Sequence, residues 1–116
     1  MANVAITGRD HYTNIIEFTG ATMSAVNDAM DVPAHSSTYT FAATVTGGAN
    51  FQLAFECNFN GNGNWFTLDA SKTINSDGGY AYFYEGKAAA RVRMRIASIS
   101  SGTPSITPHI AVGYNG

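Results

Sequence analysis

The chain has 116 residues, of which 45% are hydrophobic and 12% are charged, and its formal net charge at pH 7 is −2. This length indicates one domain with a buried core, and an aromatic content of 12% excludes an intrinsically disordered chain. No basic tract is longer than Arg91–Arg95, so the sequence does not indicate a nucleic-acid partner. No apolar run approaches the ~20 residues of a membrane helix, and the N-terminus lacks a signal-peptide pattern.

Apolar and polar residues alternate along most of the chain, which is typical of half-buried antiparallel strands. Turn residues separate the alternating runs. We expect strands near 3–7, 11–18, 21–26, 38–45, 50–58, 64–68, 72–75, 79–84, 89–98 and 104–113. Ser24–Met30 is the only predicted helix, with at most two turns.

Short strands at this spacing predict an all-β fold, an antiparallel β-sandwich of jelly-roll type with its aromatic-rich faces inward. The first ten residues carry few large apolar groups. We therefore expect an N-terminal arm over 1–10 and a single β-sandwich domain over 11–116.

The segment Phe55–Trp65, FECNFNGNGNW, combines alternating Asn and Gly with the only Trp of the chain. One interpretation is a calcium loop, because Asn58, Asn60 and Asn62 lie two residues apart and Gly63 follows. Neutral amides are weak substitutes for the carboxylates of such sites, so we expect no metal here.

A second interpretation is a sugar site at the same loop. Asn60, Asn62 and Asn64 could bond hydroxyl groups while Trp65 stacks on a sugar ring. The row Tyr80, Tyr82 and Tyr84 could stack in the same way, although such rows are more often cross-strand packing. The third interpretation, which we favour, is a hairpin tip, because Asn-Gly supplies the positive φ angles of a type I′ turn.

The sequence predicts no enzyme and no cofactor. His11, His35 and His109 belong to no triad or phosphate-binding motif. Cys57, the single cysteine, falls within an apolar strand pattern, so it is expected to be a core residue.

Arg91, Arg93 and Arg95 share one face of a predicted strand, about 6.8 Å apart. Three like charges this close together are tolerated only beside opposite charges or in open water. One interpretation is a solvated face with cross-strand partners such as Glu56 or Glu85. The other is an interface at which the arginines meet acidic groups of a neighbouring subunit.

The run F-E-C-N-F-N-G-N-G-N-W-F-T-L resembles a pattern of small virion proteins of tailed bacteriophages, in which an apolar strand precedes E-x-S-x-D-G-x-N-W and a later strand contains V-R. Glu56 matches the Glu, Asn60-Gly61 takes the place of Asp-Gly, Asn64-Trp65 matches N-W, and Arg91-Val92-Arg93 resembles the later strand.

Two positions depart from that pattern, since Asn58 replaces the Ser and Gly63 is an additional residue; the resemblance covers about Phe51–Ile99. It implies a non-enzymatic β-sandwich protein of the virion, of the capsid decoration (cement) or tail type. It also implies a homo-oligomer, in the first place a trimer, that is made in the host cytoplasm and binds the major capsid protein or another virion protein, with no membrane or nucleic-acid partner. The alternative is a carbohydrate-binding or receptor-binding module of a phage fibre or tail.

Overall fold

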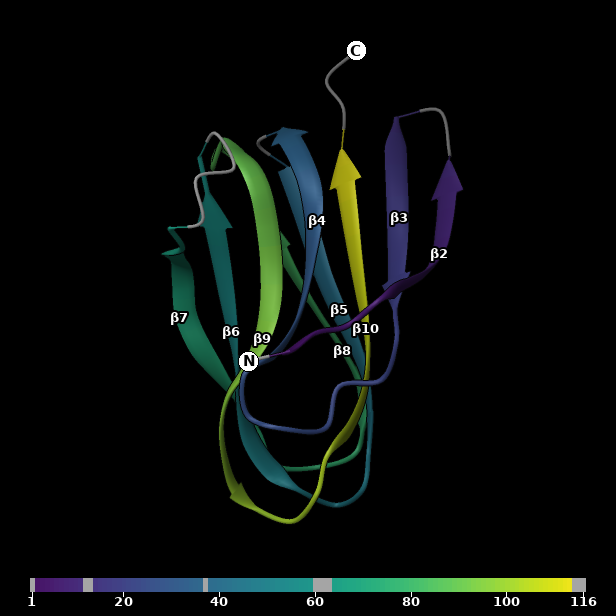
Figure 1. Cartoon of the computed structure of the whole chain (residues 1–116), viewed down its shortest axis with the longest axis vertical. Coiled ribbons are helices and arrows are strands. Elements are labelled where there is room, and N and C mark those ends of the chain that lie inside the picture. The colour runs from purple at the N-terminus through teal and green to yellow at the C-terminus, as the bar shows by residue number, and fades with distance from the viewer. Residues whose placement is uncertain (1, 12–13, 37, 60–63, 114–116) are drawn as a thin grey trace.

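The computed structural model describes residues 2–11, 14–36, 38–59 and 64–113 (Figure 1). Ten strands and no helix occur in these residues. The first five strands are β1 (Ala2–Asn3), β2 (Ile6–His11), β3 (Ile15–Gly20), β4 (Asp28–Ser36) and β5 (Thr38–Thr46). The others are β6 (Asn50–Asn58), β7 (Phe66–Ile74), β8 (Gly78–Tyr84), β9 (Ala89–Ser101) and β10 (Ser105–Gly113).

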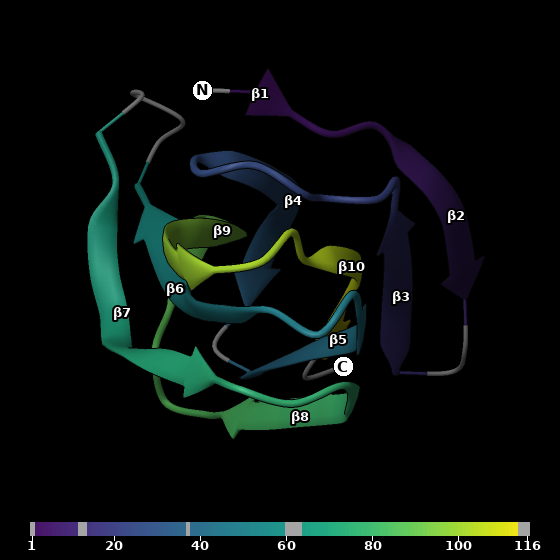
Figure 2. The ribbon, with the colours of Figure 1, turned by 90° about the horizontal axis from the view of Figure 1, so that it is seen from below.

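The strands form two five-stranded sheets that face each other (Figure 2). Sheet A has the order β1-β4-β9-β6-β7, and sheet B has the order β2-β3-β10-β5-β8. Every pairing is antiparallel except that of β1 with β4. The predicted all-β sandwich is therefore confirmed.

The core lies between the sheets and is built from the alternating inward residues of both. Phe41 of sheet B and Phe55 of sheet A stack across the interior with ring centroids 4.7 Å apart. Tyr82 and Tyr84 pack against this pair from β8. The aromatic faces thus point inward, as the alternation predicted, and the tyrosine row belongs to the core packing.

One side of the sandwich is closed by polar contacts between β7 and β8. The hydroxyl of Tyr84 donates to Oδ2 of Asp69 at 2.7 Å, and Lys72 lies 5.7 Å from the ring centroid of Tyr82. These contacts join an edge strand of sheet A to an edge strand of sheet B. They tie the two sheets together where the apolar core ends.

The predicted helix at Ser24–Met30 is wrong. Oδ2 of Asp28 accepts hydrogen bonds from the backbone N–H groups of Ser24 and Ala25, and Asn27 has a φ of 72°. Short polar side chains that bond nearby backbone favour turns over helix. The chain therefore turns here and enters β4 at Asp28.

Several strand boundaries also differ from the prediction. β4 was missed because its first residues were assigned to the helix and Pro33 interrupts its pattern. The strand expected at 21–26 is reduced to one bridge between Met23 and Ile106. The strands expected at 64–68 and 72–75 form the single strand β7, whose pairing with β6 is interrupted by register shifts.

The N-terminal residues contribute strands to both sheets, since β1 pairs with β4 and β2 pairs with β3. The segment Phe55–Trp65 joins two antiparallel neighbours, β6 and β7, so its interpretation as a hairpin is confirmed. Residues 60–63, on which the predicted turn type and most of the calcium spacing depend, lie outside the described residues.

Candidate functional site

The two outer faces of the sandwich differ in chemistry. On sheet A, the outward residues of β9 are Arg91, Arg93 and Arg95, and we call the surface around them the arginine face. On sheet B, β3, β10, β5 and β8 direct mainly Thr, Ala, Ser and Gly outward. We call this surface the threonine face, and it includes Thr19, Thr38, Thr40, Ala42, Thr44 and Thr107.

The arginine face is centred on one carboxylate. Oε1 of Glu56, on β6, accepts hydrogen bonds from Nε of Arg93 at 2.8 Å and from Nε of Arg95 at 2.9 Å. The side chain of Glu56 is 13% exposed and that of Arg93 is 8% exposed, so this ion pair is largely removed from water. Arg93 stands directly opposite Glu56 in the pairing of β9 with β6, which explains the contact.

The other two arginines also have partners within the chain. Nη1 of Arg95 donates to Oδ1 of Asn27 at 2.8 Å, and Nη2 of Arg91 lies 3.4 Å from Oδ1 of Asp31. The expected cross-strand partner Glu56 is therefore confirmed, whereas Glu85 forms no ion pair with any described residue. A role of the arginine row in a subunit contact stays a prediction.

The charges of this network lower the pKa of Glu56. Burial on its own would raise the pKa of this carboxyl, but hydrogen bonds from Arg95 and Arg93 and the charges of the two guanidinium groups outweigh burial. Glu56 therefore stays ionised at neutral pH. The guanidinium groups of Arg93 and Arg95 balance its charge, so Glu56 is not an unpaired carboxylate at the centre of the arginine face.

Trp65 covers the network from outside. The guanidinium carbon of Arg93 lies 4.2 Å from the centroid of the Trp65 ring, a cation–π distance. One ring face of Trp65 is thus already occupied, which limits its predicted role as a sugar platform. Asn64 is exposed, and Asn60 and Asn62 of the same predicted site lie outside the described residues.

Asn58 lies on the same face and is 2% exposed. Its Oδ1 atom has no hydrogen-bond partner among the described residues. In the pairing of β6 with β9 it stands opposite Arg91. Asn58 is therefore part of the packed surface of sheet A.

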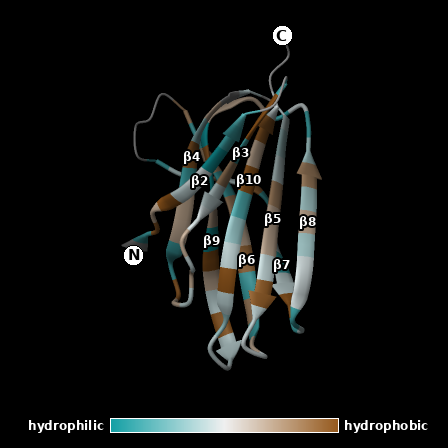
Figure 3. Cartoon of the chain, turned by 90° about the vertical axis from the view of Figure 1, so that its right-hand side faces the viewer, coloured by the Kyte–Doolittle hydropathy of each residue, from teal (hydrophilic) through white to brown (hydrophobic). Residues whose placement is uncertain are grey.

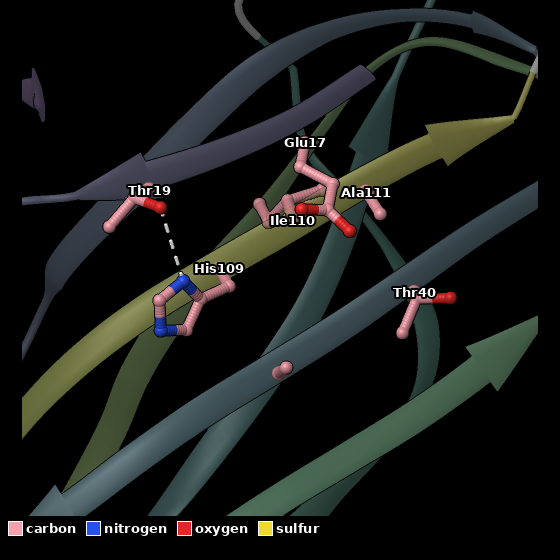
Figure 4. A pocket seen from close by; sticks show the side chains of 7 residues that line it. Glu17, Thr19, Thr40, His109, Ile110 and Ala111 are labelled. Atoms are coloured by element: carbon pink, nitrogen blue, oxygen red, sulfur yellow. Dashed lines mark hydrogen bonds between the residues drawn. The ribbon is translucent and has the colours of Figure 1, made fainter. Parts of the chain in front are cut away.

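The threonine face contains a hollow of about 290 Å³ (Figure 4). Small side chains on two adjacent strands, Ala42 on β5 and Ala111 on β10, leave this space open. The hydroxyl of Thr19 lies 3.2 Å from Nδ1 of His109 on one side, and Thr40 flanks the other side. The residues that line it are Glu17, Thr19, Thr40, Ala42, His109, Ile110 and Ala111.

No feature of the sequence predicted this hollow, although His109 was considered as a candidate site residue. Thr19 and His109 are 90 residues apart and meet because β3 pairs with β10. A hydroxyl beside an imidazole resembles part of a catalytic set, but no hydrogen bond joins His109 to Glu17 in the described chain. The hollow thus offers donors and acceptors around an apolar floor, and the third member of a triad is not in place.

Other kinds of site find little support in the described part of the chain. It contains no group of three or more His, Cys, Asp and Glu side chains placed to hold a metal ion. No helix there is long and apolar enough to cross a membrane. Cys57 is buried in the core as predicted, and burial raises the pKa of its thiol.

The chain matches no protein family and no curated protein with which it was compared. Solved structures share its fold. The SPBc2 prophage-derived protein YomS superposes with a TM-score of 0.53 at 14% identity, over 94% of this chain and 99% of that one. PirA gives a TM-score of 0.52 at 9% identity, over 90% of this chain and 97% of that one.

The CBM22-1 xylan-binding domain from Paenibacillus barcinonensis Xyn10C gives a TM-score of 0.50 at 12% identity, over 97% of this chain and 82% of that one. At such identities the likeness concerns the fold alone. The chain is thus a small β-sandwich with an architecture also found in a phage-derived protein and in a carbohydrate-binding module.

Proposed function

We propose that the protein is a non-enzymatic structural protein of a virion, which decorates or cements a capsid by docking the threonine face on the shell. The observation that carries this proposal is the composition of that face. Among the outward residues of β3, β10, β5 and β8, Glu17 is the one side chain with a formal charge.

A face of this kind is suited to a broad contact. Covering hydroxyl and methyl groups costs far less free energy than covering unpaired charges. The hydroxyls that line the hollow, those of Thr19 and Thr40, still provide directional hydrogen bonds. A protein bound across a joint between shell subunits opposes the opening of that joint, because it binds only the closed arrangement.

The resemblance of Phe51–Ile99 to small phage virion proteins supports this assignment, and the fold shared with a prophage-derived protein agrees with it. On this proposal the partners are the major capsid protein or another virion protein and further copies of the chain. The location is the virion. Several linked copies would turn weak single contacts into firm attachment.

A second candidate is the binding of a neutral glycan in the hollow. The observation that favours it is the ring of polar groups from Glu17, Thr19, Thr40 and His109 around an alanine floor. Such a module would attach a phage fibre or tail to a surface sugar. It would use the same face as capsid docking, so the two candidates differ in the partner and share the surface.

The test compares one substitution on each sheet. Thr40→Arg places a charge at the hollow, and Thr73→Arg places the same charge at an exposed position of β7 on the other sheet. Both proteins are mixed with undecorated shells of the phage that carries the gene, and co-sedimentation is measured. We expect Thr40→Arg to abolish binding, and Thr73→Arg to bind like wild type.

Circular dichroism shows whether both variants remain folded. Equal binding by wild type and Thr40→Arg, or no binding by wild type, would contradict capsid docking through this face. A glycan array run with the same proteins tests the second candidate. Retention of wild type on a defined sugar, lost in Thr40→Arg and kept in Thr73→Arg, would establish glycan binding instead.

A further inference from the structure

Three of the four edge strands of the sandwich carry features that discourage pairing with another chain. β1 has only 2 residues. β2 has a register shift between Ile6 and Gly8 and carries the charged residue Arg9. The pairing of β7 with β6 has two register shifts, each with an additional residue in β7, and β7 carries Asp69 and Lys72. Short length, bulges and charges are the usual ways in which proteins protect a sheet edge.

The fourth edge strand, β8, lacks all of these features. Its sequence, GGYAYFY, contains no charged residue and no proline over 7 residues. It pairs with β5 in an unbroken register from Gly78 to Tyr84. Within the described part of the chain its backbone is paired with β5 alone, so its other side is open (Figure 3). Such an edge is a template for another strand.

We propose that β8 is a self-association edge, at which the β8 strands of two copies pair antiparallel about a two-fold axis at Ala81. In this pairing Ala81 lies opposite its equivalent, and Phe83 lies opposite Gly79 of the second copy. Residues 79, 81 and 83 alternate onto the threonine face. The two-fold axis is perpendicular to the sheet, so the threonine faces of both copies point to the same side.

The sizes of these side chains fit the pairing. Phe83 is 77% exposed, which is the highest exposure of any large hydrophobic residue in the described chain. A side-chain atom added at Gly79 would have no neighbour within 4 Å, so space for a ring is open there. Each Phe83 would cover the Gly79 of the other copy, an arrangement known to support glycine positions at sheet edges.

The absence of charge on β8 favours a second copy of this chain as the partner at this edge. A strand that pairs with itself brings each charge close to its own equivalent, which penalises self-pairing. Within β8 this penalty is absent, because the strand contains no charge, and the acidic residues Asp77 and Glu85 lie just outside its two ends. The result would be one continuous ten-stranded sheet built from two five-stranded sheets, with a doubled threonine face. This inference does not depend on what that face binds.

The first test is sedimentation equilibrium from micromolar to millimolar concentration. We expect wild type to shift from the monomer mass to twice that mass. Ala81→Lys places two like charges on the axis, and we expect it to raise the dissociation constant about tenfold or more. The matched control is Ala70→Lys, at an exposed alanine of the edge strand β7, which we expect to dimerise like wild type.

The second test examines which residues lie opposite each other across the proposed contact between the two β8 strands. Residues directly opposite in an antiparallel pair are close enough for a disulfide, so Ala81→Cys should form a covalent dimer on mild oxidation. Ala70→Cys should form no covalent dimer under the same conditions, and the buried Cys57 is common to both proteins. A wild type that stays monomeric at every concentration, a stable trimer, or a dimer insensitive to Ala81→Lys would each overturn the proposal. A failure of Ala81→Cys to cross-link would do the same.

Discussion

The arginine face and the threonine face are built on the same kind of five-stranded sheet, yet they use their side chains in opposite ways. On the arginine face, Glu56, Arg93 and Arg95 satisfy one another and Trp65 covers them. On the threonine face, small side chains leave a hollow, with the Thr19–His109 hydrogen bond at its side. The side chains of the arginine face are thus satisfied by partners within the chain, whereas the threonine face remains available to another molecule.

This difference separates stability from binding. A largely buried ion pair depends strongly on both of its members, because either one alone would be an uncompensated charge. Exposed hydroxyl and alanine positions contribute little to folding. Substitutions on the arginine face should therefore act on the free energy of unfolding, and substitutions on the threonine face should act on association.

The largest effect is expected for Glu56→Gln, which removes the carboxylate charge shared by Arg93 and Arg95. The loss should lower the free energy of unfolding by about 3 kcal/mol, because Arg93 would remain buried without a counter-charge. Urea denaturation measures this. The control is Asp31→Asn at the more exposed partner of Arg91, where we expect less than about 1 kcal/mol. Equal losses in the two variants would contradict the distinction between the faces.

The same ion pair should make stability depend on acid pH. The pKa of Glu56 in the folded protein lies below its ordinary value of 4.5. Its contribution is therefore complete above that value and is lost as the pH falls through the folded pKa. We expect the stability gap between wild type and Glu56→Gln to be constant near neutral pH and to narrow in acid. Urea denaturation at a series of pH values would show this, and a constant gap would refute it.

A smaller loss is expected for Trp65→Ala. Removing the ring exposes the guanidinium group of Arg93 and deletes a cation–π contact, which should cost about 1–2 kcal/mol. Thermal unfolding measures the loss. Shell or glycan binding should be unchanged after this substitution, and a variant of normal stability that fails to bind would instead identify Trp65 as a ligand contact.

The smallest effect is expected for Thr19→Val, which keeps the shape of the side chain and removes its hydrogen bond to His109. We expect a change of about 0.5 kcal/mol in the free energy of unfolding, since the bond lies at a half-buried position. Chemical denaturation and the binding assays should be run together. A loss above about 2 kcal/mol would show that the threonine face is also a stability element.

The strand alternation of the sequence was sufficient to predict the sandwich and the inward aromatic faces. It also predicted the shared face of Arg91, Arg93 and Arg95 and the partner Glu56. It failed at Ser24–Met30, where the carboxylate of Asp28 and the positive φ of Asn27 favour a turn. The pattern of apolar residues in this segment does not show that the Asp28 side chain bonds the nearby backbone N–H groups and thereby favours a turn over a helix.

The side chains that share a face could thus be read from the sequence, because a period of two is a local property of extended chain. The order of the strands, in contrast, depends on pairings between residues far apart in the chain, so it becomes visible only in the folded protein. This order brings His109 beside Thr19, places Trp65 over Arg93 and leaves β8 at an open edge.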